Sequence, residues 1–397
     1  MVAAEKLQDL NIKHPINLNS DDLKANKAEV YKWLRDEAPV YKGKLSVLNL
    51  YFVSRYEDCV MVLKDPRFIR NRSTATGGGS RLPFPVPKSV KLLAESMILE
   101  DDPEHRRLRN LVHKAFTPRS LAKLGEQVET LTHELLDKAE KQPSFDLQKE
   151  FALPIPVTVI ASMMGIPDDE MSVFSGGMKA LTDGMTGLNI LRAFVWDIPR
   201  MTNYVRDLIE RKRSDPKDDM LTALIQAEED GEMLSEDELV SMVYLLIIAG
   251  YETTVHLITN SVMTLLQHPD ALAQLRDNPD LMESAIEEIL RYNGPIEGTK
   301  PIYAIEDVPL HGVTIPKGKP LMPLLGAANF DERQFDNPDV FDITRSPNRH
   351  LGFGQGIHYC LGAPLARLET KLALGILIER YPNLRLAVPA SEIQVQR

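Results

Sequence analysis

The chain has 397 residues, of which 43% are hydrophobic and 26% are charged, and its formal net charge at pH 7 is −11. These proportions are typical of a folded soluble protein and exclude a disordered or fibrous chain. The acidic balance argues against nucleic-acid binding as the main function. The sequence has no internal repeat and no clear break in composition, so we expect a single domain over residues 1–397.

Apolar residues at helical spacing dominate the chain and predict a mainly α fold. The predicted helices span roughly residues 21–38, 55–64, 103–116, 119–141, 146–164, 191–213, 235–267, 279–293 and 361–380. Short β-rich stretches at 45–54 and between 301 and 323 predict small β-sheets. Residues 70–90 combine a glycine run with three prolines and predict a long binding loop, or alternatively a linker between domains.

The helix predicted at 235–267 is long and apolar enough to span a membrane. Glu252 is the only charged residue between positions 239 and 267. However, acidic residues precede the helix, no Lys or Arg flanks it to orient insertion, and it carries several hydroxyl and amide side chains. We therefore expect a helix buried through the middle of a soluble protein. Ser235 and Glu238 form a capping-box signature at its start.

Only two cysteines, Cys59 and Cys360, occur in the chain. This number is too small for a disulfide framework and favours a reducing compartment. The N-terminal stretch has charges from Glu5 onward and no apolar run long enough for a signal peptide. The expected location is therefore the cytoplasm, with no membrane anchor.

The segment HLGFGQGIHYCLGAPLARLE, residues 350–369, places Cys360 among glycines and two residues after His358, just before a predicted helix. Glycine permits backbone conformations and close approaches that other residues do not. A thiolate before a helix N-terminus is stabilised by the N–H groups there. A lone cysteine makes no zinc or iron–sulfur site, whereas haem iron accepts one thiolate. A nucleophilic cysteine with His358 as base and a buried structural cysteine are the alternatives.

This segment resembles the haem-binding signature of the cytochrome P450 family, Phe-x-x-Gly-x-x-x-Cys-x-Gly, most strongly that of the soluble bacterial members. The matching residues are Phe353, Gly356, Cys360 and Gly362. The resemblance covers roughly residues 30 to 390. It implies a cytochrome P450 fold that holds haem b between the long central helix and the C-terminal helix. Cys360 would be the axial iron ligand, and Phe353, Gly354 and Gly362 would contribute to haem binding.

The long predicted helix contains the sequence AGYETT at residues 249–254. Gly250 inside an apolar helix costs about 1 kcal/mol relative to alanine, so its missing side chain is expected to make room for a ligand. Glu252 and Thr253 are predicted to be buried in this helix and to face a wet cavity, because burying them unpaired is costly. By resemblance, this acid–alcohol pair supplies protons for O–O cleavage, and Ala249 borders the haem. A Thr253 hydroxyl bonded to the carbonyl four residues earlier is the alternative.

Basic residues extend the resemblance. His105 and Arg109, four apart on a predicted helix, and His358 are similar in position to residues that hold the haem propionates in this family. One position departs from the pattern, because soluble bacterial relatives commonly carry an arginine for the second propionate where this chain has Ile302. Lys300 is the nearby cation that would substitute if the strand twists or bulges there. Haem is therefore expected to be held less tightly, unless another donor compensates.

Glu288 and Arg291, three apart, are placed for an ion pair on one helix face. Solvated pairs at this spacing are common and contribute little. By resemblance, however, they pair with Arg345 in a structural cluster that holds the scaffold of the cysteine loop.

Taken together, the resemblance implies a monomeric haem-thiolate monooxygenase. It would use O2 to hydroxylate or epoxidise a lipophilic small molecule: a polyketide or macrolide, a terpenoid, a steroid or a fatty acid. Two electrons from NAD(P)H would arrive through a ferredoxin or flavodoxin, since the chain lacks a dinucleotide fingerprint. A peroxide-driven peroxygenase is one alternative, although such relatives replace the acid–alcohol pair. A non-catalytic haem sensor is another, and it would need neither Glu252 nor Thr253.

Overall fold

The computed structural model describes residues 12–78, 88–116, 118–184, 192–229, 231–389 and 392–393. The chain divides into two compact units. Unit 1 consists of Met1–Arg109, Ile296–Val340 and Asn348–Leu361, and unit 2 of Asn110–Pro295, Phe341–Pro347 and Gly362–Arg397. The expectation of a single domain stays a prediction.

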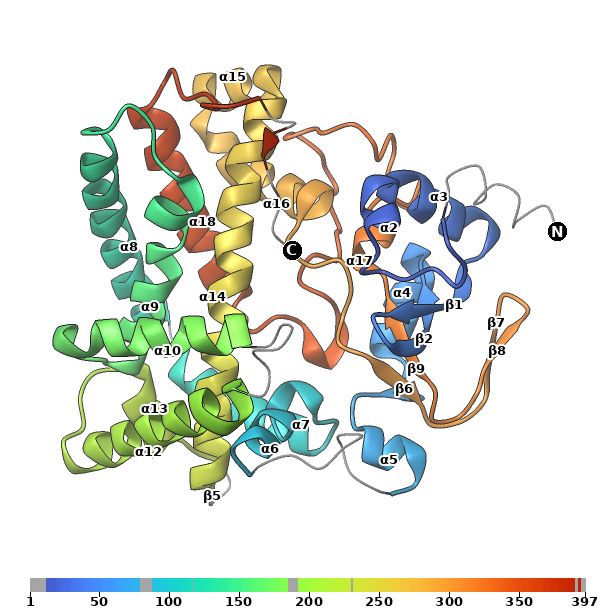
Figure 1. The fold of residues 1–397 in the computed structure, drawn as a ribbon, viewed down its shortest axis with the longest axis horizontal. Helices are drawn as coiled ribbons and strands as arrows, with labels where there is room; N and C mark the ends of the chain where they lie inside the picture. Colours follow the sequence, from blue (N-terminus) through green and yellow to red (C-terminus); the bar gives the residue numbers. More distant parts are fainter. Residues whose placement is uncertain are drawn as a thin grey trace. The chain divides into compact units, whose positions relative to one another are not determined.

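Unit 1 contains the larger sheet, with strand order β1-β2-β9-β6-β3 (Figure 1). Its strands are β1 (Val40–Leu45), β2 (Leu48–Val53), β3 (Phe68–Ile69), β6 (Ile302–Ala304) and β9 (Pro320–Pro323). β2 pairs in parallel with β9, while β1 with β2, β6 with β9 and β3 with β6 are antiparallel. A separate antiparallel pair consists of β7 (Val308–Leu310) and β8 (Val313–Ile315). Both chain segments of unit 1 thus contribute strands to one sheet.

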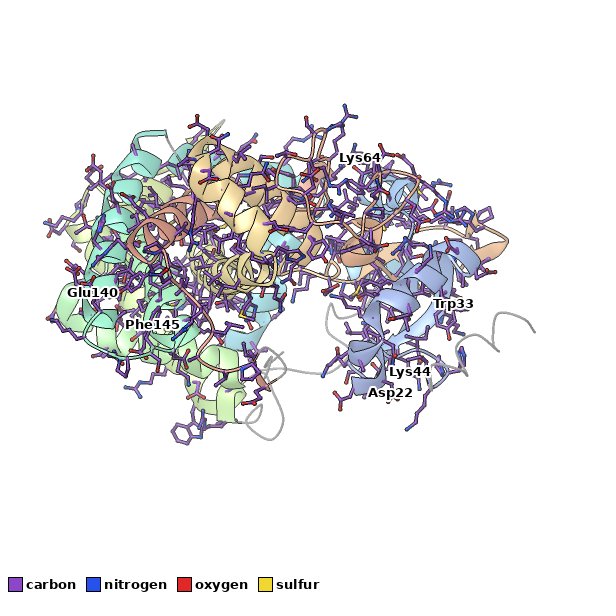
Figure 2. The ribbon with its side chains drawn as sticks, turned by 90° about the horizontal axis from the view of Figure 1, so that it is seen from above. Asp22, Trp33, Lys44, Lys64, Glu140 and Phe145 are labelled. Carbon is purple, nitrogen blue, oxygen red and sulfur yellow. The ribbon has the colours of Figure 1, made fainter. Side chains whose placement is uncertain are left out.

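Unit 1 also contains several short helices. They are α2 (Asp21–Ala25), α3 (Lys27–Glu37), α4 (Tyr56–Lys64), α5 (Arg72–Thr76), α6 (Lys88–Ala94) and α17 (Leu325–Ala328), with 3-10 turns at Met97–Leu99 and Gly356–His358. Trp33 on α3, labelled in Figure 2, packs edge-on against Tyr41 of β1 with 5.8 Å between ring centroids. α4 contacts both α17 and the 3-10 turn at Gly356–His358, so this turn is supported from within unit 1.

Unit 2 is a helical assembly around α14 (Glu236–Gln267) (Figure 1). Its other helices are α8 (Pro118–Ala139), α9 (Pro154–Met164), α10 (Met171–Gly184), α12 (Ile198–Ser214), α13 (Met220–Gln226), α15 (Pro269–Asp277), α16 (Met282–Asn293) and α18 (Ala363–Arg380). Shorter elements are π-helical turns at Leu147–Ala152 and Ala193–Asp197, 3-10 turns at Asp168–Glu170 and Pro279–Leu281, and the strand pair β4 (Glu228–Glu229) and β5 (Glu232–Met233). Helix α7 (Glu104–Ala115) begins in unit 1 and ends in unit 2. α14 contacts α9, α12, α15, α16 and α18.

The predicted capping box of α14 is confirmed. The Ser235 hydroxyl accepts from the Glu238 N–H at 3.3 Å, and the Glu238 carboxylate accepts from the Ser235 N–H at 2.7 Å. Among the described residues, α14 is the one helix long and apolar enough to cross a membrane, judged by length and composition alone. Its two ends are buried in unit 2, whereas its middle is open.

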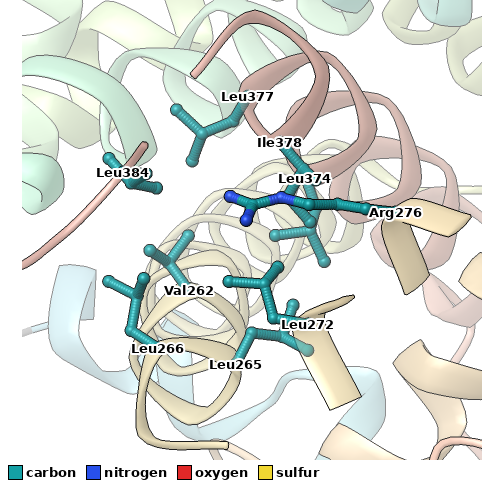
Figure 3. A pocket seen from close by; sticks show the side chains of 9 residues that line it. All are labelled: Val262, Leu265, Leu266, Leu272, Arg276, Leu374, Leu377, Ile378 and Leu384. Atoms are coloured by element: carbon teal, nitrogen blue, oxygen red, sulfur yellow. The ribbon is translucent and has the colours of Figure 1, made fainter. Parts of the chain in front are cut away.

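The C-terminal end of α14 packs against α15 and α18 through aliphatic side chains (Figure 3). A cavity of about 10 Å³ remains among them, which is room for about one water molecule. Arg276 extends over these side chains and donates from Nη2 to the Tyr381 carbonyl at 3.4 Å. This end of α14 is therefore packed core.

The expected mainly helical fold with small sheets is confirmed, and several boundaries differ. The helix predicted at 21–38 is interrupted at Asn26, and the one predicted at 146–164 starts as a π-helical turn. The loop predicted at 70–90 contains α5 and the first turn of α6, while its residues 79–87 lie outside the described residues. Helices α10, α13 and α15 and strand β1 were missed by the sequence prediction.

Candidate active site

The loop that carries Cys360 is closed by its own backbone in unit 1. The Cys360 N–H donates to the Phe353 carbonyl at 3.0 Å, directly after the 3-10 turn at Gly356–His358. Gly354 and Gly356 have φ values of +68° and +74°, a backbone region that side chains with a Cβ rarely adopt. The Cys360 side chain is half-buried. The loop therefore presents the sulfur from a fixed backbone.

The glycines of this loop differ in what lies beside them. A Cβ at Gly356 would lie 2.2 Å from the Leu63 carbonyl oxygen at the end of α4, so glycine is required for the loop to pack there. A Cβ at Gly354 or Gly362 would meet no atom within 4 Å among the described residues. The close approach that the sequence indicates is thus made by α4 at Gly356, whereas Gly354 faces open space.

Basic side chains gather beside the loop, still within unit 1. His105 on α7 is 2% exposed, and its ring lies 4.3 Å from the His358 ring, measured between centroids. Arg109, one turn further along α7, donates from Nη1 to the Ile357 carbonyl at 3.3 Å. The structure therefore brings together His105, Arg109 and His358, the three residues predicted to hold propionates.

Burial determines the charge state of His358 in this cluster. It lowers the pKa of His358 to about 2, and the charges of Arg70, His105 and Arg109 act in the same direction. His358 is therefore neutral, and its buried Nε2 has no hydrogen-bond partner among the described residues. A histidine with so low a pKa is a weak base, which counts against a nucleophilic Cys360 activated by His358.

The acid–alcohol pair lies on the open middle part of α14 in unit 2. Ala249 and Glu252 are exposed, together with Ile248 at 46% exposure, and Thr253 is half-buried. The prediction that Glu252 is buried is therefore wrong, because no described element of unit 2 covers this helix face. The Thr253 hydroxyl donates to the Ala249 carbonyl at 2.7 Å, which is the alternative that the sequence left open.

Gly250 lies where α9 packs on α14. A Cβ at this position would lie 3.4 Å from Ile160 Cδ1 of α9, at the near limit of ordinary van der Waals contact. A methyl group at this position would therefore make an ordinary contact with α9, and the packing of the two helices does not by itself require glycine. The expectation that the missing side chain leaves room for a ligand stays a prediction.

The predicted ion-pair cluster is formed inside unit 2. Glu288 and Arg291 side chains are fully buried, and Arg291 Nε and Nη2 each donate to one carboxylate oxygen at 2.8 Å. Arg345 Nε donates to the same carboxylate at 3.1 and 3.2 Å, and the Asp342 N–H adds a further bond at 3.0 Å. One buried carboxylate thus joins helix α16 to the segment at 341–347.

Comparison with known proteins decides the family. A family model described as Cytochrome P450 matches residues 200–386. The chain is 38% identical over 373 residues to the polyketide biosynthesis cytochrome P450 PksS of Bacillus subtilis, covering 93% of this chain and 92% of that protein. The solved structure of PksS is similar with a TM-score of 0.87 at 37% identity, covering 94% of each chain. This chain belongs to the cytochrome P450 family.

A second relative is also a P450 with a named activity. The chain is 41% identical over 350 residues to the mycinamicin IV hydroxylase/epoxidase of Micromonospora griseorubida, covering 87% of this chain and 85% of that protein. The predicted family, its fold and its enzyme class are thereby confirmed. The protein is a P450 monooxygenase, whose cofactor is haem b and whose co-substrates are O2 and electrons from NAD(P)H.

The residues of unit 1 fit a haem on the Cys360 side. The Nε2 of His358 is a buried polar atom without a hydrogen-bond partner among the described residues, and the space beside Gly354 is open. Arg109 lies near Cys360. Burial lowers the pKa of Arg109, and the negative charge of the Cys360 thiolate raises it. A cationic and imidazole-lined surface next to a cysteine matches the two carboxylates of haem b and its iron.

Glu369 on α18 is a buried acid to which the sequence assigns no role. It is 2% exposed, its Oε2 has no hydrogen-bond partner among the described residues, and burial raises its pKa to about 8. The sequence signal for it was an acid within the apolar stretch that follows the cysteine motif.

This carboxyl makes folding stability depend on pH. In the unfolded chain a glutamate ionises near its ordinary pKa of about 4.3, so folding becomes less favourable as pH rises from there to about 8. Glu369→Gln should remove this loss and be more stable than wild type by roughly 3–5 kcal/mol at pH 9, with no such gain near pH 4. Urea unfolding across this range measures the difference. Glu379→Gln, an exposed site on the same helix, is the control, and an equal response of both variants would contradict the assignment.

Proposed function

We propose that this P450 hydroxylates or epoxidises a lipophilic molecule of the polyketide or macrolide class, with Cys360 as the axial ligand of haem b. The observation that carries the proposal is the loop around Cys360, whose backbone is fixed beside a basic cluster in which the buried His358 Nε2 has no hydrogen-bond partner among the described residues. The substrate class is supported by the two relatives, which are named for polyketide biosynthesis and for oxidation of mycinamicin IV.

Each part of the chain has a distinct task in this proposal. Haem, when bound, supplies the redox chemistry that activates dioxygen. His105, Arg109 and His358 bind its propionates, and the backbone of Phe353, Gly354 and Gly362 shapes the surface around it. Placed just before the N-terminus of α18, Cys360 is held as a thiolate by the positive end of the helix dipole.

The open face of α14 supports a role in proton supply and substrate binding. Glu252 is exposed, which suits a side chain that takes part in proton supply, and the Thr253 hydroxyl, which donates to the Ala249 carbonyl, is proposed to hold the proton that is delivered. Ile248 on the same face offers an apolar surface to a lipophilic substrate. Gly250 lies in the same stretch of α14, where a Cβ would face Ile160 of α9.

Electron supply requires a second protein. A ferredoxin or flavodoxin that carries electrons from NAD(P)H is the proposed partner, because such carriers are acidic and α7 presents Arg106 with 72% of its side chain exposed in the same unit as Cys360. The proposed enzyme is a cytoplasmic monomer that binds neither nucleic acid nor a membrane.

Substitution of Thr253 tests the proton pathway. Thr253→Ala should keep the substrate-induced spin-state change and the consumption of NAD(P)H, but divert most oxygen to peroxide, because the proton-holding hydroxyl is lost. Peroxide and product per NAD(P)H are the measurements. Thr259→Ala is a matched control, since its hydroxyl makes the same bond to the carbonyl four residues earlier, at 2.8 Å. Unchanged product per electron in Thr253→Ala would remove this residue from the mechanism.

The substrate class is tested by binding and turnover. A library of macrolides, linear polyketides, terpenoids, steroids and fatty acids is screened for the spin-state change of the haem, and hits are incubated with O2 and a surrogate electron-transfer chain. We expect polyketide-type compounds to bind best and to yield a product with one added oxygen atom. Turnover of fatty acids or steroids alone would overturn the substrate class and leave the reaction type intact.

A further inference from the structure

Arg70 is a buried cation without an acidic partner. It follows β3 and is 7% exposed, and its Nη1 donates to the Lys300 carbonyl. Among the described residues, no carboxylate lies within ion-pair distance of its guanidinium. Asp101, the acid that acts on it electrostatically, accepts instead from the backbone N–H groups of Arg70 and Asn71 at 2.8 and 2.9 Å.

Such an arrangement is costly unless an anion completes it. Burial lowers the pKa of Arg70 to about 10, so the guanidinium is still charged at neutral pH. A guanidinium carries five N–H donors in a planar fork, and a single carbonyl uses one of them. Leaving a buried charge unpaired is unfavourable, whereas a carboxylate accepts two parallel bonds from such a fork. The chemistry of the site therefore points to a carboxylate that the described residues do not supply.

The strand register shows where this cation lies. In the antiparallel pair of β3 and β6, Phe68 is opposite Ala304 and Ile69 is opposite Tyr303. Arg70 lies in the bend that directly follows Ile69. Its donation to the Lys300 carbonyl places the guanidinium at the segment that leads into β6, two residues before Ile302. Arg70 thus offers a guanidinium beside the position that lacks the expected arginine.

The surroundings of Arg70 are those of the propionate cluster. Its charge lowers the pKa of both His105 and His358, which places it close to these two rings. All three residues belong to unit 1. Lys300, by contrast, is exposed and contributes its backbone carbonyl to Arg70. Arg70 is therefore a better candidate than Lys300 to replace the arginine that is missing at Ile302.

We propose that Arg70 binds the second propionate of haem through charge-assisted hydrogen bonds and so replaces the arginine that is absent at Ile302. This inference rests on the proposed haem-thiolate site. It assigns to Arg70 the role of a cofactor-binding residue, and it explains why a buried guanidinium is kept without a carboxylate from the part of the chain that the structure describes.

Haem transfer from the holoprotein to an apo-globin acceptor tests the inference. Arg70→Met should transfer haem about 10-fold to 100-fold faster than wild type, the range expected for loss of a hydrogen bond to a charged group. The propionate bending bands in its resonance Raman spectrum should shift as well. Arg70→Lys keeps the charge without the fork and should give a smaller increase in rate. Lys300→Ala is the control and should transfer haem at the wild-type rate.

A double variant adds a rescue experiment to this test. Arg70→Met combined with Ile302→Arg returns a guanidinium to the neighbouring strand and should slow haem transfer again. Ile302 is only 3% exposed, so an arginine there could prevent folding. If the double variant does not fold, the haem-transfer rate of Arg70→Lys decides the test. Wild-type transfer rates and unshifted Raman bands in Arg70→Met would overturn the role of Arg70. An absent thiolate spectrum in the wild-type protein would instead overturn the proposed function.

Discussion

Reduced protein under carbon monoxide should show the strongly red-shifted Soret band of thiolate-ligated haem, and Cys360→His should abolish it. The loop that fixes the Cys360 backbone is closed by its own hydrogen bond, so the substitution replaces the ligand atom while the loop remains. Imidazole donates less electron density to iron than thiolate does, and monooxygenase turnover should fall to background in this variant. An absorption spectrum with and without carbon monoxide provides the measurement.

Cys59 provides the matched control for this experiment. It is fully buried in the core of unit 1, its Sγ lies 3.2 Å from the Val53 carbonyl, and burial raises its pKa well above the usual thiol range. Cys59→Ala removes a sulfur that packs and does not ionise, so the red-shifted band should persist. A wild-type band at the position typical of histidine-ligated haem would show that Cys360 is not the ligand.

Sequence periodicity predicted most of the long helices of unit 2, with α10, of 14 residues, as an exception. For α14 the capping box also fixed the start, since Ser235 and Glu238 act over one local turn. The other elements that were missed are short. Helices such as α5, with 5 residues, and α13, with 7, are too short to be stable alone and form because of tertiary contacts.

In the candidate site, too, residues within one local motif or helix were predictable from the sequence, whereas residues placed by distant strands and helices were not. His105 and Arg109 were predictable from spacing on one helix, and Cys360 from a contiguous motif. Arg70 belongs to no motif, and its position near Ile302 becomes visible only through the pairing of β3 with β6, strands more than 200 residues apart, and its bond to the Lys300 carbonyl. The close approach at Gly356 is likewise made by a distant helix, α4. Contacts of this kind are set by the tertiary fold, which local sequence patterns do not encode.

Glu288→Gln should destabilise unit 2 by about 3–5 kcal/mol, the usual cost of removing one partner from a buried ion pair. The side chains of Glu288 and Arg291 are fully buried, and that of Arg345 is 10% exposed. Without the carboxylate charge, both guanidinium groups lose their shared counter-ion and remain in a medium that solvates charge poorly. Urea unfolding followed by circular dichroism measures the loss, and the yield of haem-loaded protein should fall with it.

The adjacent Glu287 serves as a control that distinguishes the effect of burial on stability from the effect of losing a salt bridge. Glu287 forms an equally close pair with Arg367, at 2.6 and 2.8 Å, but the two side chains are 29% and 34% exposed. Because water screens that pair, Glu287→Gln should cost less than about 1 kcal/mol, although the substitution and the helix are the same. A structural role for the buried cluster also requires that any haem-loaded Glu288→Gln protein keep the thiolate spectrum. Equal stability losses in the two variants, or a changed ligand spectrum in Glu288→Gln alone, would contradict that role.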